Sequence, residues 1–166
     1  MKDATKQPGI VISQVFLERA LFSHREDALQ LAPNTPFQPT LAVGIQGGVS
    51  PDEKTGFIRI SVQTKPEERP LYSIDVAMMA LFAVAEKEEN LPLKQYLHTA
   101  APAMLYPFVR EAVASITWRG RFGPVWLAPF NISVAMAEPS GEAPIPLPKI
   151  RKAPKVAKRQ PKSAAR

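Results

Sequence analysis

The sequence contains no cysteine and only two histidines among its 166 residues. The missing cysteines exclude disulfide frameworks, thiolate zinc sites and cysteine nucleophiles. His24 and His98 are too few for a histidine-rich metal site or for most histidine-based catalysis. The sequence also lacks a glycine-rich phosphate loop and a nucleophile elbow. We therefore expect no metal, no cofactor and no enzymatic activity.

A long apolar segment is missing as well. The longest apolar run, Ile74 to Ala85, is too short to span a bilayer and carries Asp75 near its start. Residues 1–8 are polar, and the apolar stretch after them is interrupted by polar side chains, unlike that of a secretory signal. We expect no membrane insertion and a cytoplasmic location.

Positive charge is concentrated at the C-terminal end. Eight of the 21 Lys and Arg residues follow Pro148, where no acid occurs, which leaves 13 basic residues against 15 acidic ones before that point. Six prolines follow Glu138, and this composition is typical of extended, solvated chain. We predict a flexible arm at residues 1–8, one folded domain at 9–136 and a disordered basic tail at 137–166.

The front half of the predicted domain has the alternation of β-strands. Apolar side chains occur at every second position in three runs. These runs are Leu41 to Ile45, Ile58 to Val62 and Tyr72 to Val84. An earlier run, Ile10 to Phe22, has apolar side chains on both faces, more than one layer of helices can cover. This excess predicts self-association, contact with a ligand, or both.

The sequence of the back half of the predicted domain indicates helices. Asn90 can cap a short helix with Pro92 at its first position, and a longer helix is expected from Ala103 to Trp118, with Gly120 placed to end it. One apolar stripe follows the longer helix, formed by Leu105, Val109, Ala112, Val113 and Ile116. Four strands joined by short turns and followed by helices predict an α+β domain, a four-stranded antiparallel sheet with the helices packed on one face.

One block near the end of the domain resembles the SecB family of protein-export chaperones. The family pattern is aromatic–Pro–aromatic–x–Arg–Glu, then Arg–Gly–x–Phe, then Leu–x–Pro–x–Asn, and the spacing here matches without a gap. The matching positions, for which we expect structural roles, include Pro107, Arg110, Glu111, Arg119, Gly120, Phe122, Pro129 and Asn131. The resemblance continues upstream at Gln38 and Pro39, so it covers residues 9–136.

The resemblance implies an ATP-independent chaperone, a holdase that assembles as a dimer of dimers and binds unfolded precursor polypeptides in long apolar grooves. The strand that lines the family's groove matches the run from Leu41 to Ile45. The resemblance therefore places Leu41, Val43 and Ile45 in contact with a client polypeptide. Weaker matches in the neighbouring loops add Phe37, Leu91 and Leu93.

The family also recruits the translocation motor SecA through an acidic patch on the sheet, and here the match is incomplete. One of the matching positions is acidic, Asp75, but Arg19 and Ser23 occupy positions where acidic residues are expected. Three hypotheses follow: a chaperone for export, a SecB-like chaperone for another client such as an antitoxin, and a nucleic-acid-associated or ribosome-associated protein acting through its basic tail.

Overall fold

The computed structural model describes residues 9–32, 39–65, 71–85 and 91–129. The elements, in chain order, are β1 (Ile10–His24), the short 3-10 helix η1 (Glu26–Gln30), β2 (Leu41–Val49), β3 (Thr55–Thr64), β4 (Tyr72–Val84), α1 (Leu93–Thr99) and α2 (Ala101–Trp118). The predicted arm at 1–8 and tail at 137–166 lie outside the described residues, so the domain boundaries stay predictions.

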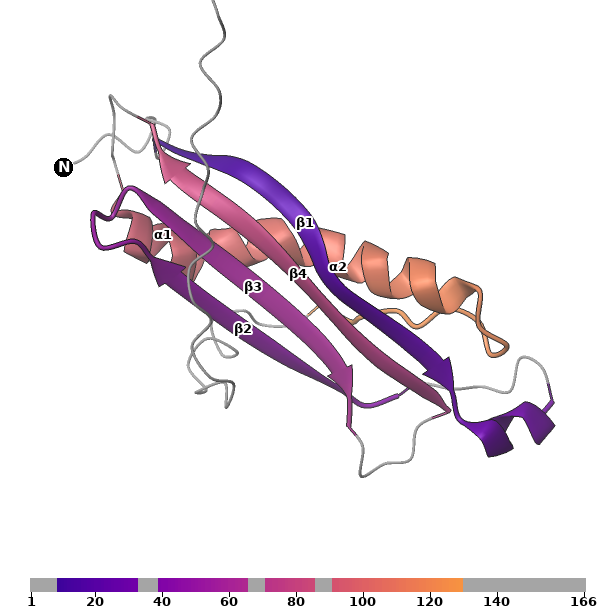
Figure 1. Ribbon diagram of the computed structural model, residues 1–166. Helices are drawn as coiled ribbons and strands as arrows, with labels where there is room; N and C mark the ends of the chain where they lie inside the picture. The colour runs from indigo at the N-terminus through magenta and orange to yellow at the C-terminus, as the bar shows by residue number, and fades with distance from the viewer. Residues whose placement is uncertain (1–8, 33–38, 66–70, 86–90, 130–166) are drawn as a thin grey trace, which may run out of the picture.

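The four strands form one antiparallel sheet in the order β1-β4-β3-β2, with both helices on the same face (Figure 1). The predicted architecture is therefore confirmed. A tight turn joins β2 to β3, where the Ser50 hydroxyl accepts a hydrogen bond from the Thr55 N–H at 3.1 Å. The expectation of short turns throughout is wrong for the first connection. Because β1 pairs with β4, the chain between β1 and β2 crosses from one edge of the sheet to the other.

Two irregularities in β1 explain its apolar side chains on both faces. Its register with β4 shifts between Ile12 and Gln14 and again between Leu17 and Arg19. Each shift inserts one residue, which reverses the side to which the following side chains point. The residues opposite the helix-facing positions of β4 are Ile10, Ile12, Val15, Leu17, Ala20, Phe22 and His24. The remaining apolar residues of β1 point to the opposite face, which we call the outer face.

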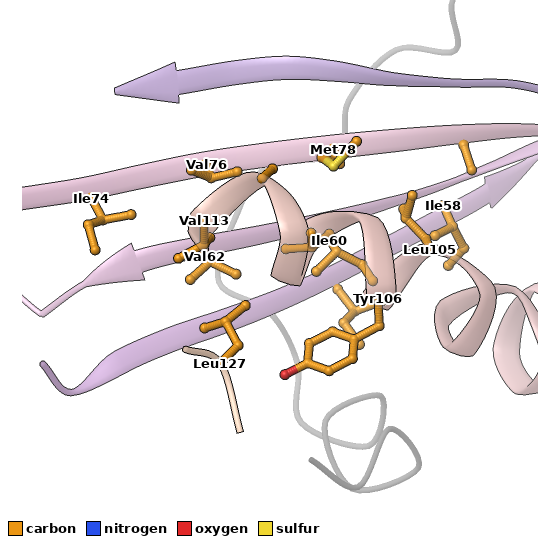
Figure 2. Close-up of a cluster of buried hydrophobic side chains, with 14 of the residues drawn as sticks. Ile58, Ile60, Val62, Ile74, Val76, Met78, Leu105, Tyr106, Val113 and Leu127 are labelled. Carbon is orange, nitrogen blue, oxygen red and sulfur yellow. The ribbon is translucent and has the colours of Figure 1, made fainter. Parts of the chain in front are cut away.

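The main core lies between the sheet and α2. Side chains of β3 and β4 meet the predicted stripe of α2, and Figure 2 shows Ile60 and Val62 facing α2 near Leu105 and Val113. All four side chains are at most 1% exposed. A second, smaller cluster of Phe57, Met79 and Leu81 lies on the outer face. The sheet is therefore apolar on both sides, although the helices cover only one.

Both helices begin close to their predicted positions. α2 starts two residues earlier than expected, because Pro102 sits in its first turn, where the fixed φ of proline suits a helix. Pro92 precedes α1 as its N-cap residue rather than standing at its first helical position, since its ψ of 134° is extended. Asn90, the predicted cap, lies outside the described residues.

After α2 the chain turns back and runs along the helix, so that residues 121–129 close one side of the core. Val125 and Leu127 are 4% and 5% exposed. The Val125 N–H donates to the Thr117 hydroxyl at 2.8 Å, and the Tyr106 hydroxyl donates to the Ala128 carbonyl at 2.5 Å. We call residues 121–129 the return segment.

Candidate functional site

The predicted client-binding strand is β2, an edge of the sheet. Leu41, Val43 and Ile45 lie opposite Thr64, Val62 and Ile60 of β3, which places all three on the helix side. We call these three side chains the β2 strip. Ile45 is 6% exposed and belongs to the core, whereas Leu41 and Val43 are only partly buried and pack at its margin. The strip therefore changes along one strand from core to accessible apolar surface.

Helix α1 accounts for this gradient, since it covers only one end of β2. A small cavity beside Gly47, Gly48 and Val49 is lined from the helix by Lys94, Leu97 and His98. Gly56, opposite Val49 on β3, lets α1 approach, because a Cβ there would lie 2.7 Å from the Leu97 side chain. The Leu41 end of the strip has no such cover from α1.

The other predicted groove residues are split between core and margin. Leu93 begins α1 and is 1% exposed, so it stabilises the packing of that helix. Leu91 is partly buried against the same cluster. Phe37 lies outside the described residues. The accessible part of the predicted groove thus consists of Leu41, Val43 and Leu91, and its client contacts stay a prediction.

A hollow of about 430 Å³ on the side of α2 away from the sheet was not foreseen from the sequence. Its lining residues are Pro107, Arg110, Glu111, Ala114, Ser115, Trp118 and Trp126. Trp118 is 69% exposed and Trp126 is 62% exposed. Met104 and Phe108, 42% and 49% exposed, extend the same face of the helix. The spacing of Met104, Phe108 and Trp118 is the signal that could have revealed this second apolar face.

The residues of the family motif frame this hollow and the turn after α2. Pro107, Arg110 and Glu111 line the hollow. Arg119 is the C-cap of α2. Gly120 follows it, where a Cβ would collide with the Tyr72 hydroxyl.

The remaining motif positions lie in the turn and the return segment. The Phe122 N–H donates to the Tyr72 hydroxyl at 2.5 Å. Pro129 ends the return segment, and Asn131 lies outside the described residues.

The outer face carries two ion pairs. Arg19 contacts the Asp75 carboxylate at 2.8 Å, and the Gln63 amide donates to the same carboxylate at 3.2 Å. Arg59, which is 3% exposed, contacts Glu18 at 2.7 Å. Each acid on this part of the face is therefore matched by a base, so the face is not an acidic patch.

Neither a metal centre nor a membrane span is found in the part of the chain that the structure describes. Within the described ranges, no three His, Asp or Glu side chains are grouped to hold a metal ion. Among the same residues, no helix is both long and apolar enough to cross a bilayer.

A family match accompanies the sheet order and the one-sided helical layer described above. The family model described as "Preprotein translocase subunit SecB" matches residues 3–138 of this chain. The chain belongs to the SecB family. This confirms the resemblance found in the motif of α2 and the turn after it.

Curated relatives carry the same family name. A protein-export protein SecB of Cellvibrio japonicus is 30% identical over 84 residues, 51% of this chain and 50% of its own length. One from Acidithiobacillus ferrooxidans is 31% identical over 60% of this chain and 74% of its length, and one from Polaromonas naphthalenivorans is 25% identical over 86% and 92%. The chain thus spans only about half the length of the Cellvibrio relative.

A solved structure supports the fold independently. The Mycobacterium tuberculosis SecB-like chaperone, in complex with a ChAD peptide from an antitoxin, superposes with a TM-score of 0.56. The two chains are 21% identical, and the match covers 74% of this chain and 91% of the other. At this identity the likeness concerns the fold alone.

The two outer-face ion pairs differ in burial, which predicts a difference in their contribution to stability. Glu18→Ala removes the carboxylate that pairs with the buried Arg59 guanidinium, so we expect the free energy of unfolding to fall by about 1–3 kcal/mol. Asp75→Ala breaks the more exposed pair with Arg19 and should cost about 0–1 kcal/mol. Denaturant titration at one fixed protein concentration measures both, and equal losses would contradict the prediction.

Proposed function

We propose that this SecB-family chain is an ATP-independent holdase that binds unfolded polypeptides and keeps precursor proteins competent for export. The observation that carries the proposal is the accessible end of the β2 strip, together with family membership. Leu41 and Val43 offer apolar surface at a sheet edge without unfolding any element. Equilibrium binding needs no catalytic step and no cofactor, and the cytoplasmic location expected from the sequence belongs to the same proposal.

The strip suits an extended client. Its side chains repeat at every second residue, which is also the period at which an extended polypeptide presents side chains to one side. Burial of client apolar surface yields roughly 25 cal/mol per Å², offset by the cost of ordering the client. Such binding depends on apolar content rather than on one sequence, as a holdase requires.

Serine substitutions within the strip test this role. The double variant Leu41→Ser/Val43→Ser should lose about 1–2 kcal/mol of client affinity, roughly tenfold, while the fold persists. Ile45→Ser should instead destabilise the fold by about 2–5 kcal/mol, because that side chain is core. Fluorescence titration with a reduced, alkylated and permanently unfolded protein measures binding, and circular dichroism measures folding.

Ala42→Ser is the matched control, since Ala42 is exposed on the same strand but points to the outer face. It should change neither measurement. Unchanged affinity in the double variant would overturn the assignment of the strip to client binding.

We also propose that the chain assembles as a homotetramer, a dimer of dimers. The support is the exposed apolar face of α2 with Trp118 and Trp126 beside it, which is larger than the scattered apolar residues of ordinary surfaces. The buried Nε of Arg110 has no hydrogen-bond partner among the described residues, and a second copy can supply one.

Light scattering at micromolar concentration should give a mass near four times that of the 18.3 kDa chain. Trp118→Ser should lower this mass, because it removes the most exposed aromatic side chain on the interface proposed here. A monomer mass for the unaltered chain would contradict the proposal.

The charge arrangement of the outer face favours weak binding to the motor SecA. Asp75 is held by Arg19, and Ser23 has no charge to add, so the net field that would steer a basic partner is small. A chaperone dedicated to another client, such as an antitoxin, is the alternative that this observation supports. Nucleic-acid binding through the basic tail stays a prediction, since the tail lies outside the described residues.

Arg19→Glu should strengthen motor binding, because it replaces the paired base with a second acid beside Asp75. Deletion of residues 137–166 should act in the same direction, because it removes eight basic residues and only two acidic ones, Glu138 and Glu142. Calorimetric titration of purified motor at low salt compares these two variants with the unaltered chain. Tight binding by the unaltered chain, lost in Asp75→Ala and unaffected by Arg19→Glu, would show that the ion pair does not limit the contact.

A further inference from the structure

Arg121 joins two parts of the chain that are far apart in the sequence. Its backbone N–H donates to Nε2 of His24, the last residue of β1, at 3.2 Å. Its guanidinium donates to the Leu31 carbonyl twice, through Nε at 3.2 Å and Nη2 at 3.0 Å. One residue of the return segment therefore holds both the end of β1 and the start of the crossing connection to β2.

Aromatic rings fix the position of His24. Its imidazole packs edge-on against Phe22 and Tyr72, each at 5.2 Å between ring centroids, and lies 6.4 Å from Phe122. The Tyr72 hydroxyl in turn accepts from the Phe122 N–H and donates to the Gly123 carbonyl at 3.3 Å. These rings aim Nε2 at the turn after α2.

We propose that His24 and Arg121 form a latch between the β1–β2 connection and the return segment, and that protonation of His24 opens it. A neutral imidazole with its hydrogen on Nδ1 accepts at Nε2. The imidazolium carries hydrogens on both nitrogens, so an N–H would then face the Arg121 N–H. Histidine is the side chain whose charge ordinarily changes between pH 5 and 8.

The charged and titratable groups around the imidazole do not compensate for the loss of the hydrogen bond between the Arg121 N–H and Nε2 of His24. Burial raises the pKa of the Tyr72 phenol above its ordinary value, so it stays neutral throughout that range. Arg25, next to His24 in the chain, pairs with Asp27, and the Arg121 guanidinium is a second positive group. No carboxylate forms an ion pair with His24 among the described residues.

The sign of the pH dependence follows from these contacts. Acid favours opening, because the imidazolium has no lone pair at Nε2 with which to accept the Arg121 N–H. The Thr117 and Tyr106 hydroxyls continue to hold the rest of the return segment, because neither gains a charge in this range. Opening is therefore confined to the turn after α2, around the Arg121 N–H.

Hydrogen exchange of the Arg121 amide in the full-length chain tests the latch, after correction for the intrinsic pH dependence of exchange. Loss of one hydrogen bond should lower its protection about three- to tenfold between pH 7.5 and 5.5. His24→Gln, which cannot titrate, should remove this pH dependence. His98→Gln removes the chain's other histidine, which is exposed on α1, and should leave it unchanged.

A nitrogen-15 spectrum of the histidine rings provides a second measurement that needs no variant. At pH 7.5 it should show His24 with its hydrogen on Nδ1 and Nε2 as the acceptor. The inference is overturned by the opposite tautomer, by protection that is constant with pH, or by pH dependence that persists in His24→Gln. None of these readouts involves a client, so they stand apart from the proposed chaperone function.

Discussion

The constraint on which the rest of this structure depends is that two helices cover only part of one face of a four-stranded sheet. Helix α2 packs mainly on the central strands β3 and β4, and α1 packs on the β2–β3 hairpin. The edge strands therefore keep apolar side chains that the described part of the chain does not fully bury, such as Leu41 on β2 and Leu17 on β1. Because exposed apolar area is costly in water, this leftover surface favours burial against a partner, and core and accessible apolar surface merge along single strands.

The outer face shows how the placement of charges can distinguish proteins that share one fold. An acidic surface attracts a basic partner through its summed field, which depends on net charge more than on any single residue. Here Arg19 stands within ion-pair distance of Asp75, and Glu18 is directed to Arg59, so acids and bases cancel locally. The β2 strip lies on the opposite side of the sheet, and its apolar character is independent of this cancellation.

The sequence predicts the layers of this fold better than its connections. The alternation in β3 and β4 and the stripe of α2 identify the core, because burial of one face imposes those periods. Periodicity carries no information about which strands pair, so the crossing between β1 and β2 was missed. Because the register shifts at Ser13 and Glu18, a simple period of two does not show which side chains of β1 lie on which face of the sheet. Burial of Ile45 and Leu93 could not be foreseen either, since it depends on how the helices pack against the sheet.

The residues that carry the family resemblance lie on α2, in the turn after it and in the return segment, rather than on the β2 strip. Gly120 makes room for the Tyr72 hydroxyl, Phe122 donates to it, and Pro107 and Arg110 lie on α2. A side chain at position 120 would meet the Tyr72 hydroxyl in the turn that leads into the return segment, whereas a change at Arg19 alters the charge of the outer face. The family motif and the charge pattern of the outer face therefore involve separate residues, so the family assignment is compatible with an outer face that is not acidic.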